Sequence, residues 1–195
     1  KGQCEVEKNA FISFDDAWSG NLNLLPILKK YNIPITLFVP IKAIEDGHIW
    51  LNTVRRQFAK IDNELKNGIS IKDLKKTPFE NGCSLYESAK KTDNAHREIM
   101  TKEQLIAYSK FASIASHTVT HPILTNCSKK TVEFELNKSY EVLNEWKLIT
   151  NQSFAYPNGS YNEETIKILK KSQYKYAFTT EPKFIDLSVK DNNYA

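Results

Sequence analysis

Residues 9–40 read NAFISFDDAWSGNLNLLPILKKYNIPITLFVP, and the order of patterns in this stretch decides the fold. Residues 9–14 form a short apolar run that stops at an acidic pair, which predicts a buried strand. Residues 22–33 carry apolar side chains at helical spacing, with Pro26 early enough to be tolerated in a first turn. Residues 34–40 are a second apolar run that ends at a proline. Strand, helix and strand in this order form a βαβ unit, so we expect the two strands to be parallel.

The same alternation resumes at residue 101. A helix is expected over 101–111, where Thr101 followed by Gln104 forms a capping-box pattern, and a strand over 112–116. Further on, the patterns predict a helix, a strand, a helix and a strand over 129–148, 153–156, 162–172 and 175–180. Alternating strands and helices indicate an α/β protein with a parallel sheet, whose working site lies at the carboxyl ends of the strands.

Residues 41–100 interrupt this alternation. They contain lysine-rich helical segments at 53–68 and 71–77, separated by polar turns with glycine, and no convincing strand. We therefore expect a helical, peripheral insertion within one domain that spans residues 1–195, a length sufficient to bury a sizeable core.

Composition excludes several classes of protein. The hydrophobic fraction of 41% and the charged fraction of 26% are ordinary for a soluble globular protein, and no apolar run approaches the roughly 18 residues of a membrane span. The net charge of +4 is spread over lysine pairs typical of solvated helix faces, which argues against a nucleic-acid partner. Cys4, Cys83 and Cys127 show no CxxC spacing, so we expect mostly free thiols, with one disulfide left open. The N-terminus has no apolar signal core, and the compartment stays undetermined.

Residues 116–122, SHTVTHP, place His117 and His121 so that both imidazoles can point the same way from one helical turn or a tight loop. The pair Asp15 and Asp16 ends the first predicted strand. Taken alone, the acidic pair would be a turn or a helix cap, and the histidines would as often be surface residues. Together, at the ends of two strands, they predict a metal site with two histidines and one aspartate, a donor set that leaves a position open for water.

The second aspartate and the YPNG turn at residues 156–159 would complete a hydrolytic site. A metal ion lowers the pKa of a water ligand from about 15.7 toward about 7, and a neighbouring carboxylate can take the proton. A backbone N–H of the turn would stabilise the developing oxyanion, which is typically worth about 10²–10³ in rate. Taken alone, YPNG would be only a tight turn.

Three stretches, SFDD (13–16), SHTVTH (116–121) and FAYPNG (154–159), occur in this order and carry a family resemblance. They resemble the first three motifs, Thr-Phe-Asp-Asp, His-Ser/Thr-x-x-His and Arg-x-Pro-x-Gly, of the polysaccharide deacetylases (carbohydrate esterase family 4, NodB-like domain). The resemblance covers residues 10–40 and 100–180. It implies a distorted (β/α) barrel that hydrolyses N-acetyl or O-acetyl groups of sugars.

The resemblance implies a role for each matching residue. Asp15 would be the catalytic base, Asp16 would bind the metal together with His117 and His121, and Thr118 would hold the turn between the histidines. The ion would be Zn²⁺, although nitrogen and carboxylate ligands also accept Co²⁺, Ni²⁺ or Mn²⁺.

The YPNG turn has its own implied roles. Asn158 would offer its backbone N–H to the oxyanion, and Tyr156, Pro157 and Gly159 would contact the substrate.

The sequence also departs from the family pattern. Ala155 stands where the third motif has arginine, and no histidine follows His121, so the usual general acid is not located. We expect the chain to be incomplete at its C-terminus, because an unclosed parallel sheet would expose an edge. His48 and His96 are expected to face solvent rather than to replace the acid.

These observations predict a metal-dependent hydrolase that removes acetyl groups from N-acetylated sugars of a polysaccharide, glycan or glycolipid. Two alternatives stay open: a non-catalytic carbohydrate-binding protein on a degenerate deacetylase fold, and an O-acetyl esterase with the same site. The resemblance implies a cell-envelope or secreted location.

Overall fold

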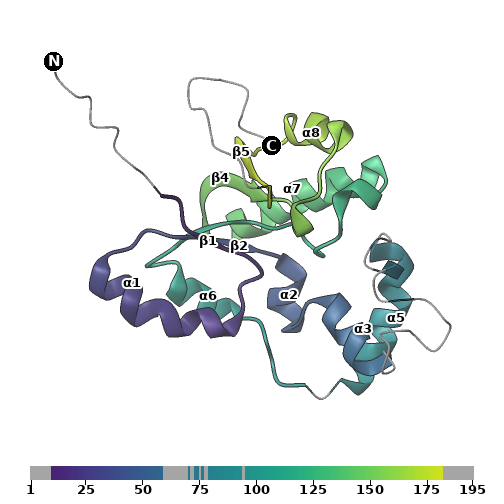
Figure 1. Cartoon of the computed structure of the whole chain (residues 1–195), viewed down its shortest axis with the longest axis horizontal. Helices are drawn as coiled ribbons and strands as arrows, with labels where there is room; N and C mark the ends of the chain where they lie inside the picture. The colour runs from purple at the N-terminus through teal and green to yellow at the C-terminus, as the bar shows by residue number, and fades with distance from the viewer. Residues whose placement is uncertain are drawn as a thin grey trace.

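The computed structural model describes residues 10–58, 70, 73, 74, 76, 79–93 and 95–181 (Figure 1). Its sheet has five parallel strands in the order β1-β2-β3-β4-β5. The strands are β1 (Ser13–Phe14), β2 (Thr36–Val39), β3 (Ser113–Ser116), β4 (Ile149–Ala155) and β5 (Tyr176–Phe178). Since each strand pairs with its neighbour in the sequence, the chain winds in one direction only, as in a (β/α) barrel and unlike a doubly wound sheet. The predicted α/β class with parallel strands is confirmed.

Seven α-helices are described: α1 (Leu25–Tyr31), α2 (Ile41–Asp46), α3 (Trp50–Phe58), α5 (Phe79–Thr92), α6 (Lys102–Tyr108), α7 (Lys129–Glu145) and α8 (Glu163–Leu169). Short 3₁₀ turns cover Ser19–Leu24, Leu124–Asn126 and Pro157–Gly159. None of these helices combines the length and the apolar character that crossing a bilayer requires.

The helices and strands predicted at 22–40 and 101–180 are present, with shifted ends. The predicted helix at 22–33 is a 3₁₀ turn followed by α1, with Pro26 in the first turn and Asn32 in the left-handed conformation at the end. The capping box before α6 is confirmed, because the Gln104 N–H donates to Thr101 Oγ1 at 3.2 Å and the Thr101 N–H donates to Gln104 Oε1 at 2.9 Å.

The predicted buried strand at 9–14 is wrong in its burial and its length. Only Ser13 and Phe14 pair with β2, and Phe11 and Ile12 are 57% and 41% exposed. Within the described residues β1 is the outer strand of the sheet and is paired on one side only. An outer strand leaves its apolar side chains accessible, whereas the predicted strand at 34–40, observed as β2, is buried throughout.

Alternate side chains of the strands build two separate apolar layers. Toward the helices, Leu37, Val39 and Ile114 join the main core, and Phe154 joins a second cluster under α7 and α8. The other face of the sheet carries Phe38, Ala115, Ala155 and Phe178. Phe178 of β5 stacks on Phe11, which precedes β1, with ring centroids 4.7 Å apart. The two outer strands therefore approach each other, and the sheet curls into part of a barrel.

The described residues between 41 and 100 form the helices α2, α3 and α5. Trp50, Val54 and Tyr86 are buried in the main core. The end of the segment pairs with the loop after β1, since Ser19 N–H donates to the Glu98 carbonyl at 2.7 Å. Amphipathic helices must bury their apolar faces, and α3 and α5 do so mainly against each other (Figure 1). Whether the segment is an insertion within one domain stays a prediction, and much of 53–68 and 71–77 lies outside the described residues.

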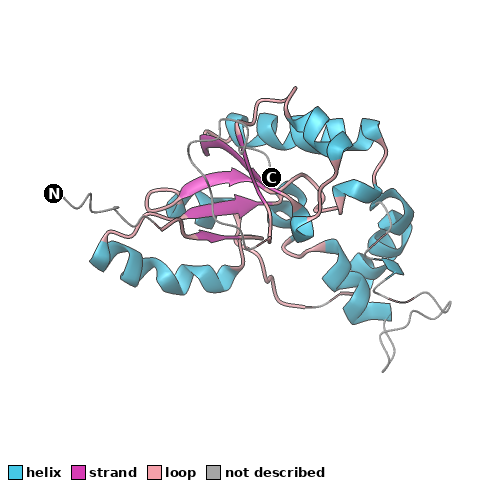
Figure 2. Cartoon of the chain, turned by 45° about the horizontal axis from the view of Figure 1, so that its top comes forward, coloured by secondary structure: helices cyan, strands magenta, loops and turns pink. Residues whose placement is uncertain are grey.

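Figure 2 shows the strands pointing toward the helices that Figure 1 labels α2, α3 and α5. These helices lie beyond the carboxyl ends of the strands, where the predicted site residues are found. Cys83 is a free thiol, the Cys127 thiol donates to the Ile123 carbonyl at 3.6 Å, and Cys4 lies outside the described residues.

Candidate metal centre

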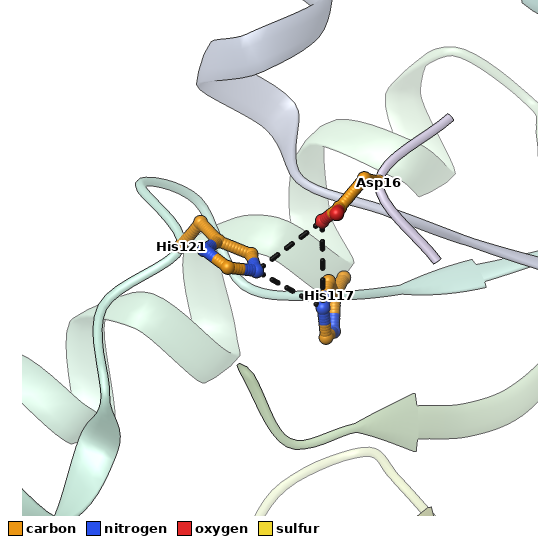
Figure 3. A group of neighbouring side chains, drawn as sticks. All are labelled: Asp16, His117 and His121. Carbon is orange, nitrogen blue, oxygen red and sulfur yellow. Dashed lines mark hydrogen bonds and ion pairs between the residues drawn. The ribbon is translucent and has the colours of Figure 1, made fainter. Parts of the chain in front are cut away.

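Three of the predicted ligands converge at the carboxyl ends of β1 and β3. Asp16 Oδ1 lies 3.2 Å from His121 Nε2 and 3.7 Å from His117 Nε2, and the two Nε2 atoms are 3.2 Å apart. Figure 3 shows the three side chains pointing toward one another. Among the described residues this is the one cluster of three or more histidine, cysteine or acidic side chains that could hold a metal ion.

The geometry of the three atoms fits a metal ion. Zinc bonds to nitrogen and carboxylate oxygen of about 2.0–2.2 Å would place tetrahedral ligands about 3.3 Å apart, close to the separations seen here. The carboxylate of Asp16 receives the Trp18 Nε1–H on Oδ2 at 3.2 Å, whereas the buried Oδ1 has no hydrogen-bond partner among the described residues. Buried polar atoms are rarely left in this state without a partner, water or an ion.

The tautomer of His117 also suits a ligand. His117 is 2% exposed, and its Nδ1 lies 2.8 Å from the carbonyl oxygen of Ala155. A carbonyl can only accept, so Nδ1 carries the proton and Nε2 keeps its lone pair toward the cluster. Burial, and next the neighbouring His121, lower the pKa of His117 to about 4, which keeps the ring neutral at pH 7. A proton on His121 Nε2 could be donated to Asp16 Oδ1 or to His117 Nε2 but not to both, whereas a cation could bind all three atoms.

The histidines lie on a tight loop rather than on a helical turn. Thr118 and His121 have φ values of 72° and 60°, in the left-handed region that residues with a side chain rarely adopt. Asp16, at the end of β1, has φ of 69°. Each such residue costs about 1–2 kcal/mol. Thr118 stabilises the loop from within, because its hydroxyl donates to the His117 carbonyl and accepts the His121 N–H at 3.0 Å.

Asp15 lies beside the cluster with its side chain open to solvent on one side. Partial burial, and next the charge of Asp16, raise the pKa of Asp15 to about 6, while His121 opposes the rise. A carboxyl group with a pKa close to neutrality is well suited to take a proton during catalysis.

A cavity of about 160 Å³ opens next to the cluster. Asp16 and His121 form one wall, and Trp18, Trp50 and Asn158 are among the other lining residues. Apolar and aromatic walls with a few polar groups are typical of sites for small organic groups, including sugars. Trp50 opens α3, so the segment between 41 and 100 forms part of this cavity.

Comparison with known proteins agrees with the order of the motifs and with the fold. The family model for polysaccharide deacetylases matches residues 2–177. The chain belongs to the polysaccharide deacetylase family.

Several members of this family are similar to the chain. The poly-beta-1,6-N-acetyl-D-glucosamine N-deacetylase of Staphylococcus aureus is 29% identical over 180 residues, which cover 92% of this chain and 50% of the relative. Among solved structures, the deacetylase PplD of Streptococcus pyogenes in complex with acetate has a TM-score of 0.61 at 23% identity, covering 91% of this chain and 58% of that one. BC0361, a polysaccharide deacetylase from Bacillus cereus, has a TM-score of 0.53 at 20% identity, covering 89% of this chain and 40% of that one. The chain thus spans about half the length of the curated relatives it matches.

In this member of the deacetylase family, one residue of the YPNG turn lines the cavity and the other three are buried. Asn158 lines the cavity, at φ of 60°. Tyr156, which the sequence placed against the substrate, is 2% exposed and packs its ring against Phe154 and Tyr161 at 5.2 Å and 5.6 Å between centroids. Pro157 and Gly159, predicted in the same role, are also buried and do not line this cavity.

Two further expectations meet different outcomes. His96 is exposed, as predicted. His48 does not face solvent: its side chain is 14% exposed, and its Nδ1 lies 3.4 Å from Glu98 Oε2. His48 lies between α2 and α3, and Glu98 lies against its ring.

One residue at the site escaped sequence reasoning. Glu135 of α7 is buried under the loop from His117 to His121, the histidine loop, and accepts hydrogen bonds from its backbone. The available signal was an acidic residue on the inward face of an amphipathic helix, between Val132 and Leu136.

Proposed function

We propose that this protein is a metal-dependent hydrolase that removes acetyl groups from N-acetylated sugars of a polysaccharide, glycan or glycolipid. The observation that carries the proposal is the convergence of Asp16 Oδ1, His117 Nε2 and His121 Nε2 beside a second carboxyl group and a cavity. Zn²⁺ is the ion that this donor set favours, and Co²⁺, Ni²⁺ and Mn²⁺ are accepted by the same ligands.

The chemistry divides between the ion and the chain. When bound, a divalent ion acts as a Lewis acid at an acyl oxygen and at water. Asp15, next to Asp16 and with a raised pKa of about 6, takes the proton of the attacking water. Asp16, His117 and His121 hold the ion.

The cavity supports an acetamido group as the reacting part of the substrate. Trp18 and Trp50 offer flat apolar surfaces for the methyl group and the sugar ring, and Asn158 stands at the polar side, where its backbone can face a developing oxyanion. The S. aureus relative is named for poly-beta-1,6-N-acetyl-D-glucosamine, a polymer that carries such groups. We therefore take β-1,6-linked N-acetylglucosamine oligomers as the first substrate to test.

The first experiment measures metal content by mass spectrometry in the wild type, His117→Ala and His96→Ala, which replaces an exposed histidine of the same chain. We expect about one zinc per chain in the wild type and in His96→Ala, and none in His117→Ala. After the protein has been loaded with zinc, acetate release from the oligomers is assayed. Absence of zinc from the wild type, after incubation with excess zinc, would refute the proposal.

The assay also separates the alternatives. Zinc binding together with binding of the oligomers, but no acetate release from amides or O-acetylated sugars, would support a carbohydrate-binding protein, and release from O-acetyl esters alone would identify an esterase.

A further inference from the structure

A buried carboxyl group beneath the histidine loop has no part in the reaction proposed above. Glu135 lies in the middle of α7 and is 2% exposed. It shares the inward face of this helix with Val132, Leu136 and Leu143. A carboxyl group among apolar neighbours is costly unless hydrogen bonds replace its lost hydration, so its contacts indicate what it does.

Both oxygens of Glu135 accept hydrogen bonds from the loop between the two histidines. Oε2 accepts the N–H of Val119 at 2.7 Å and the N–H of Thr120 at 2.9 Å. Oε1 accepts the Thr120 hydroxyl at 2.6 Å. Bonds of this length to a carboxylate are about twice as strong as bonds between neutral groups.

The opposite side of the same loop is held by α2. The carbonyls of Thr118 and Val119 accept the N–H groups of Ile41 and Lys42 at 3.2 Å and 2.8 Å, in the first turn of that helix. The loop is therefore fixed on its carbonyl side by a helix N-terminus and on its amide side by Glu135. Left-handed residues such as His121 persist only where the surrounding structure holds them in place.

We propose that Glu135 is a positioning residue that holds His121 within metal-binding distance of His117 and Asp16. The inference rests on the metal site of the proposed function, and it adds a residue that touches neither the ion nor the substrate. Without the carboxylate, the amides of Val119 and Thr120 lose these acceptors, and the loop relaxes from the conformation that keeps the three ligand atoms together.

The test compares variants that separate geometry from charge. Glu135→Gln keeps the length of the side chain: its amide oxygen can accept both N–H groups, and the Thr120 hydroxyl can rotate to accept from the amide nitrogen. Glu135→Asp keeps the charge but shortens the side chain by one methylene, so the carboxylate no longer reaches the loop. Glu133→Ala is the matched control, because it removes an exposed glutamate from the same helix.

Two readouts besides activity apply: zinc affinity by competition with a chromogenic chelator, and the visible absorption spectrum of the Co²⁺-loaded protein. Glu135→Asp is expected to weaken zinc binding by about 10- to 100-fold, the usual cost of losing support behind a metal ligand, and to change the Co²⁺ spectrum. Glu135→Gln and Glu133→Ala are expected to keep the affinity and the spectrum of the wild type. Circular dichroism checks that each variant is folded.

Two results would overturn the inference: wild-type zinc affinity in folded Glu135→Asp, or lost affinity in folded Glu135→Gln. If Glu135→Asp does not fold, Glu135→Gln still tests the inference, since lost affinity in that folded variant would overturn it. Failure of the proposed function looks different, because then the wild type and Glu133→Ala themselves bind no zinc.

Discussion

Replacing Gly159 by alanine should destabilise the protein more than any other Gly→Ala change at a described position. Gly159 ends the YPNG turn, with φ of 68°. A Cβ atom built on it would lie 2.2 Å from Thr180 Oγ1 and 2.7 Å from the Thr180 backbone nitrogen. The hydroxyl can rotate away, but the backbone nitrogen cannot move without displacing the chain after β5.

Two terms set the magnitude of this change. The left-handed conformation costs a residue with a Cβ about 1–2 kcal/mol. Forcing an extra methyl group into a packed site costs about 1–3 kcal/mol. The expected loss in the free energy of unfolding is therefore about 2–5 kcal/mol. For a domain of this size, that loss corresponds to a decrease in Tm of roughly 4–20 °C.

Gly20→Ala is the control for the thermal denaturation experiment. A Cβ at Gly20 meets nothing within 4 Å, and its φ lies outside the left-handed region. Alanine there should be neutral or stabilise by up to about 1 kcal/mol, because it restricts the unfolded chain. Circular dichroism followed through the unfolding transition measures both variants. Equal Tm values for Gly159→Ala and Gly20→Ala would refute the reasoning.

Three further predictions concern the site and its support. Asp15→Asn should lower acetate release by about 10²–10⁴ while metal content is unchanged. In the wild type, kcat/KM should be half-maximal near pH 6, rise above it and fall below it, since the base must be ionised. A pH-independent rate would contradict this role. Asp46→Asn should reduce the loss of stability that urea unfolding measures between pH 7 and pH 3. Burial alone would raise the pKa of Asp46, but hydrogen bonds, first from Lys90, lower it. The stability that Asp46 contributes is therefore present above the usual carboxyl pKa of 3.8 and is lost as pH falls through the lower pKa of the folded state. Gly82→Ala should raise KM more than it lowers kcat. A Cβ there would lie 2.6 Å from the Trp50 ring and would shift that ring within the cavity. Unchanged kinetics in a folded variant would exclude Trp50 from substrate binding.

Part of the site could be predicted because its residues lie in local patterns. The apolar runs at 9–14 and 34–40 with a helical pattern between them predicted parallel strands, and parallel strands place their carboxyl ends together. Asp16, His117 and His121 follow such strands directly, so their convergence could be expected without knowledge of the loops. The capping box at Thr101 is local as well, and the structure confirms it.

Other features depend on contacts between segments that are distant in the sequence. The bond from His117 to the Ala155 carbonyl sets the tautomer of the histidine, and since it uses the backbone, the identity of residue 155 carries no sign of it. The role of Glu135 depends on which loop packs against α7. The burial of Tyr156 reflects the aromatic cluster around it, although the residue sits in a motif that predicted substrate contact.

The sequence by itself therefore determined the class of fold, the order of the elements and the three residues of the candidate metal centre. Periodicity and motif spacing indicate local conformation and show which residues follow the carboxyl end of a strand. Only the tertiary structure decided that Phe11 and Ile12 before β1 are exposed, that α3 contributes Trp50 to the cavity and that Glu135 bonds to the histidine loop. These features arise because side chains distant in sequence share one surface, and because left-handed backbone at residues such as His121 is held by neighbours that no local pattern reveals.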